Sequence, residues 1–412
     1  MKKSVLIVCF EFPPHEEIGG RRWAKFAKSL LKFGYEVSIL TNTLSKNDTS
    51  FHWITEEESR RLTYYFIKPN AISTWLRHSD SFLSPFKFRI AKYLLSVLFK
   101  GSIYDLSIGL KYRFEKKMVQ ILEKEKHKTI IVTGAPFNLL FYSACLKKKL
   151  PGINLICDFR DPWLSAENYG MKTLTKTRKA KEEFKFQTVV KYADVITAPN
   201  AFMLEDIKDE SGWLSNKTRF VELPHAFDPD DYKVIESIQK NKNVITIIYA
   251  GALYMGIEPW LQSISYYLNQ INSKSKANKI VLKIYTPHTD FYKQCLIKND
   301  YIAVSDAIGS MIFEEIAKAD LILILLAPHN KNFVTSKFYE YMPYKKPFLY
   351  HGPEGFVSNK IEREGLGFCL KNVNTLSEIQ IKLHNTNFSS NIEGFTFASI
   401  TRSILLKLIE NN

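Results

Sequence analysis

The chain has 412 residues, of which 45% are hydrophobic. This is longer than a typical domain with a single hydrophobic core, so two domains are expected. Its five cysteines are scattered, with no Cys-x-x-Cys pair or Cys/His metal spacing, which argues against a disulfide scaffold and favours buried free thiols in a reducing compartment. The formal net charge of +15 suits nucleic acid, an anionic membrane or phosphorylated ligands, but no nucleic-acid-binding motif is present, so we expect no nucleic-acid partner.

Short apolar runs alternate with longer amphipathic segments along the whole chain. The first run, residues 5–10, is too short for a signal peptide and has no small-residue cleavage site after it, so it predicts a buried strand. Later runs of the same kind are EVSILT, TIIVT, NLICDF, DVITA, VITIIYA, KIVLKIY, DLILILL and PFLYHG. Such runs are typical of strands buried on both faces, and the alternation predicts parallel sheets built from β-α-β units.

Two helical segments of the N-terminal half have distinct patterns. Residues 21–33 place Trp23, Phe26, Ala27, Leu30 and Leu31 on one face. Residues 84–101 interleave an apolar set with a basic set; the sets are Phe86, Ile90, Leu94, Val97, Leu98 and Lys87, Arg89, Lys92, Lys100. This second pattern fits a helix that lies on an anionic membrane, or a core-facing helix with a solvated basic face. No stretch reaches the roughly 20 apolar residues of a membrane-spanning helix.

A polar, proline-containing segment, LPHAFDPDDYKVIESIQKNKN, separates the two halves, and VITIIYAG then restarts a strand-then-glycine pattern. We therefore predict an N-terminal domain over 1–225, a linker over 226–243 and a C-terminal domain over 244–395. Residues 396–412 are expected to form a helix that packs back on the N-terminal domain. The predicted fold class is α/β, with two doubly wound, Rossmann-like domains. Ligands of such folds bind at the carboxyl ends of strands, here in a cleft between the domains.

The order of the motifs resembles the retaining glycosyltransferases of family 4, which have the GT-B fold. The resemblance covers most of the chain; it rests on residues 12–41, ICDFRDPW, ADVITAPN, LPHAFDPDDY, YAGAL, ADLILILL and SKFYEYMPYKKP. In LPHAFDPDDY, His225 and Ala226 replace the Asn-Gly of the family's interdomain turn. The resemblance implies two domains that face each other across a cleft, with the donor sugar nucleotide on the C-terminal domain and the acceptor on the N-terminal one.

The first candidate site residues follow the first predicted strand. Gly19 and Gly20 are expected in the turn before a helix, where glycine lets a ligand approach the backbone and the helix N-terminus attracts anions. Arg21 and Arg22 add positive charge. Gly20 and Arg21 are therefore candidates for contact with the donor phosphate or the acceptor. The alternative is an ordinary strand–helix turn with solvated arginines.

A second group, Asp158, Arg160 and Asp161, ends the strand NLICDF, whose end should point into the cleft. Many family members have His-Asp here, and this chain has Arg160–Asp161, which are the catalytic candidates. The Arg160 guanidinium suits a phosphate or an anionic acceptor. The alternative is a structural Asp–Arg pair beside a packed Trp163.

In the C-terminal half, Gly251 resembles the glycine of the family's Gly-Arg…Lys-Gly motif, but Ala252 and Met255 stand about where its cations would be. The phosphate is then held elsewhere, or donor binding is weak or absent. Thr335 or Ser336 should cap a short helix over 337–342, in which Lys337 would meet phosphate.

Glu340, about one helical turn or ~5 Å further on, would accept hydrogen bonds from the two ribose hydroxyls. It matches the second glutamate of the family's Glu-x7-Glu pattern, whose first position falls at Asn332. The alternative for Glu340 is a weak surface salt bridge with Lys337.

These features predict a glycosyltransferase of hexosyl or N-acetylhexosaminyl type that uses a UDP- or GDP-linked sugar with retention. Its acceptor would be a glycan or lipid-linked intermediate of surface polysaccharide or glycoconjugate synthesis. No metal and no cofactor besides the donor are expected, because no Asp-x-Asp or histidine cluster is present and helix termini and basic side chains can neutralise a diphosphate. A cytoplasmic location is expected, with peripheral contact to the membrane if residues 84–101 dock there. The alternatives are a nucleotide-sugar epimerase on the same fold and a degenerate, non-catalytic binding subunit.

Overall fold

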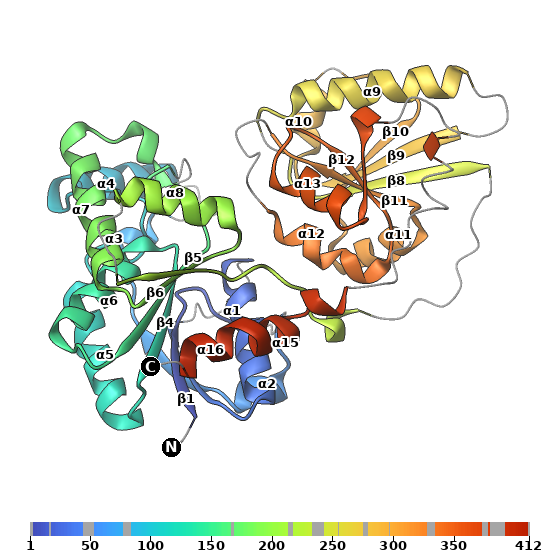
Figure 1. Ribbon diagram of the computed structural model, residues 1–412. Coiled ribbons are helices and arrows are strands. Elements are labelled where there is room, and N and C mark those ends of the chain that lie inside the picture. Colours follow the sequence, from blue (N-terminus) through green and yellow to red (C-terminus); the bar gives the residue numbers. More distant parts are fainter. Residues whose placement is uncertain are drawn as a thin grey trace. The chain divides into compact units, whose positions relative to one another are not determined.

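The computed structural model describes residues 3–15, 18–43, 53–76, 84–165, 169–212, 217–232, 243–253, 255–274, 279–295, 297–327, 334–372, 378–379 and 392–410. The chain divides into two compact units: Met1–His225 together with Phe397–Asn412, and Ala226–Thr396 (Figure 1). Each unit contains one sheet in which every described strand pairing is parallel, with helices packed against it. The α/β class with two doubly wound units is confirmed.

The first unit has a seven-stranded sheet with the order β3-β2-β1-β4-β5-β6-β7. Its strands are β1 Ser4–Val8, β2 Glu36–Asn42, β3 Thr63–Ile67, β4 Thr129–Gly134, β5 Asn154–Phe159, β6 Val195–Ala198 and β7 Arg219–Glu222. Its helices are α1 Ile18–Lys32, α2 Glu56–Arg60, α3 Ala71–Thr74, α4 Ser84–Leu98, α5 Lys111–Glu125, α6 Phe137–Lys149, α7 Lys176–Tyr192 and α8 Ala201–Ser211. The strand order reverses between β1 and β4, which is where ligands bind in folds of this kind.

The C-terminal residues return to this first unit. They form α15 Phe397–Ile400, a π-helical turn Thr401–Leu405 and α16 Leu406–Glu410. The Phe397 ring packs edge-on against Phe26 of α1 with ring centroids 4.9 Å apart. At the other end, the Tyr35 hydroxyl donates to the Glu410 carboxylate over 2.6 Å.

The second unit has a six-stranded sheet with the order β10-β9-β8-β11-β12-β13. Its strands are β8 Val244–Ala250, β9 Lys279–Thr286, β10 Ile302–Asp306, β11 Leu321–Leu325, β12 Phe348–His351 and β13 Gly367–Cys369. Its helices are α9 Glu258–Ser273, α10 Thr289–Gln294, α11 Ile312–Lys318, α12 Ser336–Glu340 and α13 Phe356–Arg363. Here the order reverses between β8 and β11.

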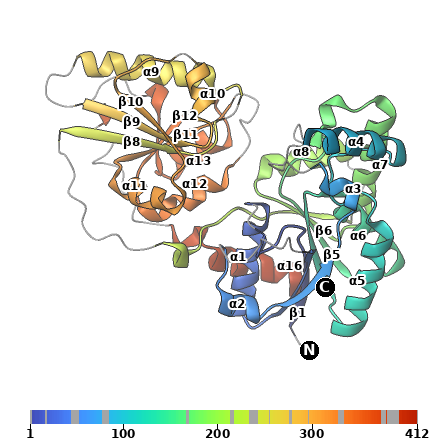
Figure 2. The ribbon, with the colours of Figure 1, turned by 180° about the vertical axis from the view of Figure 1, so that it is seen from behind.

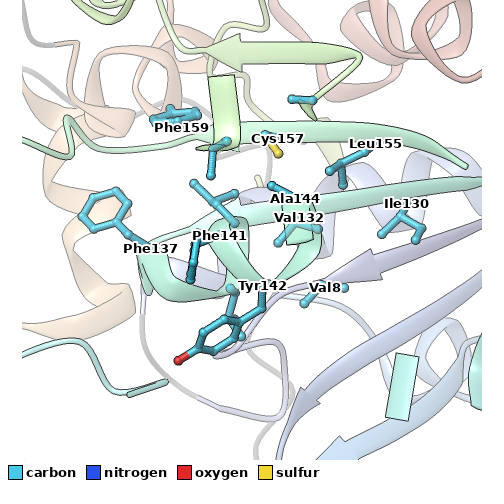
Figure 3. Close-up of a cluster of buried hydrophobic side chains, with 14 of the residues drawn as sticks. Val8, Ile130, Val132, Phe137, Phe141, Tyr142, Ala144, Leu155, Cys157 and Phe159 are labelled. Carbon is cyan, nitrogen blue, oxygen red and sulfur yellow. The ribbon is translucent and has the colours of Figure 1, made fainter. Parts of the chain in front are cut away.

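Alternation along β8 shows how this second sheet is covered on both faces. Ile245 and Ile247 belong to a hydrophobic cluster with α9, whereas Ile248 belongs to another cluster with α11, α12 and α13. The strand is apolar at almost every position because both of its faces are buried. The first sheet follows the same logic: Val8, Val132 and Cys157 of its strands belong to one buried cluster with the α6 side chains Phe137 and Phe141 (Figure 3).

The apolar runs quoted from the sequence all form strands, and the face of α1 that carries Trp23, Phe26, Ala27 and Leu30 is fully buried as predicted. The edge strands β3, β7, β10 and β13 were not among the predicted runs. Their sequences, such as RFVE and IAVSD, mix polar and apolar residues, because an edge strand is covered less completely than a central one. In the described part of the chain, no helix combines the length and apolar character needed to cross a membrane.

Candidate functional site

The carboxyl ends of the strands in the second unit bring two predicted residues together. Gly251 directly follows β8, beside the point where the strand order reverses, and its N–H donates to the Tyr285 carbonyl over 2.9 Å. Lys337 lies in the first turn of α12. A Cβ added at Gly251 would lie 1.9 Å from the Lys337 Nζ, so the amine occupies the space that a side chain at 251 would take. The space taken by this amine and the positive φ of Gly251, +158°, both favour glycine at 251.

The end of α12 is tied to the same strand. The Tyr341 hydroxyl, one residue after the helix, donates to the Ala250 carbonyl over 3.2 Å. The Tyr232 hydroxyl donates to the Glu340 carbonyl. The Tyr341 bond holds the end of α12 against the end of β8, and the approach of Lys337 to Gly251 is consistent with this anchoring.

Lys337 is an electrostatically unusual lysine. Burial lowers the pKa of its amine, and the charge of Glu340 opposes that shift. Within the described part of the chain, no ion pair joins Lys337 to Glu340, so the surface salt bridge given above as the alternative for Glu340 is not formed. A partly buried amine at the end of a central strand is suited to a phosphate, because an anion would restore the charged form.

Two details of the predicted helix differ from the structure. The α-helix is α12, Ser336–Glu340, and a 3₁₀ turn over Met342–Tyr344 follows it, whereas the prediction was one helix over 337–342. Thr335 occupies the N-cap position without a side-chain capping bond. The α-helix ends early because Pro343 has no N–H to continue the backbone pattern. Asn332, the first position of the family's glutamate pair, lies outside the described residues.

The loop after Gly251 supplies no cation, as the sequence indicates. The Ala252 carbonyl accepts a 2.6 Å hydrogen bond from the Tyr249 hydroxyl, and Met255 is exposed. The His288 ring, after β9, contacts the Leu253 carbonyl through Nδ1 at 2.8 Å. The described residues of this loop therefore form hydrogen bonds with their neighbours and supply no basic side chain, and Lys337 is the cation that approaches Gly251.

His351 is a candidate that the sequence did not single out. It ends β12 and is 8% exposed, and its Nε2 has no hydrogen-bond partner among the described residues. Its ring lies edge-on to Trp260 with centroids 5.0 Å apart, and the Trp260 Nε1 also lacks a partner within those residues. Burial lowers the pKa of His351 to about 4. In the sequence, the feature that could have identified His351 is its position at the end of the apolar run PFLYHG.

In the first unit, the expected position of the glycine pair is wrong. Gly19 and Gly20 lie inside the first turn of α1 and not in a loop before it. A Cβ at Gly20 would fall 1.9 Å from the Glu11 carbonyl oxygen, and one at Gly19 would fall 2.5 Å from Arg160 Nη1. The close packing of α1 against the backbone after β1 is therefore a sufficient reason for Gly20, whereas Gly19 leaves room for the Arg160 side chain.

The solvated-arginine alternative is also wrong, because Arg21 and Arg22 are both buried. The Arg21 guanidinium lies over the Trp53 ring, 5.4 Å from its centroid. The Arg22 guanidinium donates to the carbonyls of Leu223 at 2.5 Å and Pro224 at 3.0 Å, at the end of the first unit. Arg22 thus joins α1 to the last residues before the second unit begins.

Asp158 was expected to point out of the strand end, and the structure corrects this. Its carboxylate is fully buried within β5 and accepts five hydrogen bonds. The donors are Arg22 Nε at 3.4 Å, Arg22 Nη2 at 3.3 Å, Trp23 Nε1 at 2.7 Å, Thr133 Oγ1 at 3.1 Å and Thr197 Oγ1 at 2.8 Å. A carboxylate enclosed in this way stabilises the fold and is not available to a substrate.

Arg160 and Asp161 lie beyond the end of β5 and are partly exposed. Arg160 Nε donates to the Asp161 carboxylate over 3.1 Å, and Arg160 Nη1 donates to the Gly19 carbonyl over 2.6 Å. Trp163 is buried, stacks on Phe137 with centroids 4.9 Å apart and donates to Glu182 over 2.9 Å. The structure thus forms the Asp–Arg pair beside a packed tryptophan, and it brings Arg160 to the first turn of α1.

In the part of the chain that the structure describes, no cluster of three or more His, Cys, Asp or Glu side chains is arranged to hold a metal ion. No protein-family model and no curated protein sequence matches the chain.

Solved structures do match the whole chain. The N-terminal domain of Candida albicans trehalose-6-phosphate phosphatase matches with a TM-score of 0.63 and 11% identity, over 100% of this chain and 97% of that one. A UDP-forming α,α-trehalose-phosphate synthase from Burkholderia xenovorans matches with a TM-score of 0.54 and 12% identity, over 100% and 96%. An E. coli trehalose-6-phosphate structure bound with UDP-2-fluoro glucose matches with a TM-score of 0.55 and 10% identity, over 100% and 96%. At these identities the likeness establishes the fold: the chain has the α/β architecture of the GT-B type.

Proposed function

We propose that the chain is a glycosyltransferase that takes a sugar from a UDP- or GDP-linked donor. The observation that carries this proposal is the partly buried Lys337 amine packed against Gly251, where the strand order of the second sheet reverses. The shared fold of a structure bound with UDP-2-fluoro glucose supports the same ligand class. Retention, a hexosyl or N-acetylhexosaminyl donor, and a glycan or lipid-linked acceptor in surface polysaccharide synthesis follow from the resemblance to family 4.

The donor is proposed to lie along α12. Lys337 would hold the diphosphate, with the Ser336 hydroxyl as a further donor, and Gly251 leaves the room that the amine needs. Glu340, at the other end of this short helix, would accept hydrogen bonds from the two ribose hydroxyls. As the bond between the anomeric carbon and the diphosphate breaks, negative charge grows on the leaving oxygen, and the Lys337 cation would stabilise it.

Arg160 and Asp161 are proposed for the acceptor side of the reaction. In this role Arg160 binds an anionic group of the acceptor, and Asp161 orients the guanidinium through the bond to its Nε. Gly20 would contribute indirectly, because it lets the first turn of α1, whose Gly19 carbonyl binds Arg160, pack closely against the segment after β1. Arg21 lies in the same turn and would add positive charge to this side of the site.

A second candidate is a binding subunit that holds the nucleotide sugar without transferring it. One observation favours it: Arg160 already donates to Asp161 and to the Gly19 carbonyl, so its contacts are partly used within the protein.

Calorimetric titration with UDP, GDP and their sugars tests the donor site. Lys337→Ala should abolish the advantage of a nucleoside diphosphate over its nucleoside, because the amine meets only phosphate. The matched control is Lys298→Ala, an exposed lysine that precedes β10 and so lies at the amino end of the same sheet. Equal losses for nucleoside and diphosphate would indicate a damaged helix instead.

Incubation of a bound nucleotide sugar with candidate acceptors then separates the functions. A glycosylated acceptor supports transfer, and donor binding without turnover supports the binding subunit. An altered sugar formed without any acceptor would identify the nucleotide-sugar epimerase.

A further inference from the structure

The helix α4 in the first unit has two apolar faces, and only one of them packs inward. Ala91 and Leu95 are fully buried, and Leu95 forms a small core with Ile103 and Ile108. On the rest of the helix, large apolar side chains are open to solvent: Phe86 is 64% exposed, Tyr93 69%, Val97 66% and Leu98 60%. The core-facing alternative therefore explains one face of α4 and leaves the other unexplained.

The exposed apolar side chains are accompanied by positive charge. Residues 84–101 contain Lys87, Arg89, Lys92 and Lys100 and no acidic residue. Lys87, Arg89 and Lys92 are exposed, and none of them forms an ion pair in the described part of the chain. A surface helix that serves only the fold usually pairs some of its cations with nearby carboxylates, and this one does not.

The helix α7, which lies beside α4, extends the basic surface. Arg178 of α7 donates to the carbonyls of Ser96, Phe99 and Gly101 at the end of α4, with distances of 3.2 Å to Phe99 and 2.8 Å to Gly101. The two helices lie side by side in both views (Figures 1 and 2). Residues 172–181, which lead into α7 and form its first turns, carry five basic residues and no acidic one, and one of these, Lys179, pairs with Glu183. Arg178 thus fixes α4 beside a second basic segment.

We propose that the outer face of α4, together with the start of α7, docks on an anionic lipid bilayer. Phe86, Tyr93 and Val97 would enter the boundary between headgroups and acyl chains, while the flanking lysines and arginine meet lipid phosphates. A second copy of the chain fits this face poorly, because it would bring two predominantly basic surfaces together. Nucleic acid would match the charge and leave the exposed apolar side chains without a role. This inference stands independently of the proposed sugar transfer.

Flotation of the full chain with lipid vesicles tests the docking surface. Vesicles of phosphatidylcholine alone are compared with vesicles that also contain phosphatidylglycerol, at low and high salt. The variant Lys87→Gln/Arg89→Gln/Lys92→Gln should bind the anionic vesicles about 100-fold more weakly, because each basic residue near such a surface strengthens binding about fivefold. The control Lys116→Gln/Lys298→Gln/Lys407→Gln removes the same charge at exposed positions elsewhere and should retain binding.

A second pair of variants tests the apolar part. Tyr93→Ser should weaken binding several-fold, and the loss should persist at high salt, where the electrostatic part is screened. Tyr112→Ser on α5 is its control, since Tyr112 is 77% exposed and lies on a different helix. Circular dichroism and nucleotide titration should be unchanged in all variants.

Several results would overturn the proposal. No binding of the wild type to anionic vesicles is the simplest of them. Equal losses of vesicle binding in the α4 triple variant and its control would show that binding depends on the overall charge of the protein and not on the α4 surface. A concentration-dependent dimer that Tyr93→Ser dissociates, without vesicle binding, would assign this face to a second copy of the chain. Binding to a short RNA in place of vesicles would assign it to nucleic acid.

Discussion

Replacing Gly251 by alanine is expected to weaken nucleoside diphosphate binding by moving the Lys337 amine. The new Cβ would lie 1.9 Å from Nζ, whereas heavy atoms in contact are separated by about 3.5–4.0 Å. The amine must therefore move by roughly 2 Å, which is enough to break a charge-assisted hydrogen bond of about 2.8 Å. The loss of one such bond weakens binding by about 1.5–3 kcal/mol, or roughly ten- to a hundredfold in Kd.

The substitution should also lower stability, because Gly251 has a φ of +158°, a backbone conformation that residues with a side chain rarely adopt. Nζ is the far end of a flexible side chain, and rotation about the lysine torsions relieves the overlap without moving the backbone. The free energy of unfolding, measured by urea titration, is therefore expected to fall by about 1–3 kcal/mol through backbone strain. Because this strain does not involve Lys337, the loss of stability should persist when the lysine is removed, whereas the loss of affinity should not.

A double-mutant cycle with Lys337→Ala isolates the mechanism. Calorimetry on the wild type, both single variants and the double variant gives the coupling free energy between the two positions. If Gly251 acts only by leaving room for the amine, alanine at 251 should cost nothing further once the lysine has been removed. Additive losses would refute this reasoning and indicate that the ligand itself approaches the glycine backbone. Unchanged affinity in Gly251→Ala, with a loss in Lys337→Ala, would also refute it.

Further substitutions probe the other groups. Glu340→Ala should weaken binding of the nucleoside alone by about 3 kcal/mol, through two lost ribose hydrogen bonds, and unchanged calorimetric affinity would remove the ribose role. Diphosphate affinity should fall as pH rises toward the lowered pKa of Lys337, below its ordinary value of 10.5, and Lys337→Arg should abolish this dependence. Burial lowers the pKa of His351 to about 4, so the unfolded chain takes up its proton first and His351 contributes a loss of about 3 kcal/mol of stability between pH 6.5 and 4. In urea titrations His351→Gln should remove this contribution relative to the wild type, in which the buried His225 adds a loss over the same range, Glu210, with a pKa raised to about 7, opposes it, and Glu315, with a pKa lowered to about 2, contributes only below pH 4.5. Asp158→Asn should lower the free energy of unfolding by about 3–5 kcal/mol, because it leaves the buried Arg22 guanidinium without its counter-charge, and an unchanged midpoint would contradict the structural role.

The central strands and the buried face of α1 could be predicted because their signal is local. Each central strand is covered on both faces, so its own residues are apolar, and the spacing of Trp23, Phe26 and Leu30 follows the helix period. Edge strands such as β7 and β10 lack that double cover and leave no comparable pattern. The motif order then led to a GT-B-type fold, which the structure and its likeness to solved structures confirm.

The candidate sites depend on contacts between residues that are far apart in the chain. Asp158 and Arg22 are separated by 136 positions, and only the folded structure shows that the carboxylate is enclosed rather than presented at a strand end. The packing of Gly20 against the Glu11 carbonyl and the meeting of Lys337 with Gly251 arise in the same way. Periodicity in a sequence reports which faces of an element are apolar. Which face finds a partner is decided by packing, and for this reason the open face of α4 became visible only in the tertiary structure.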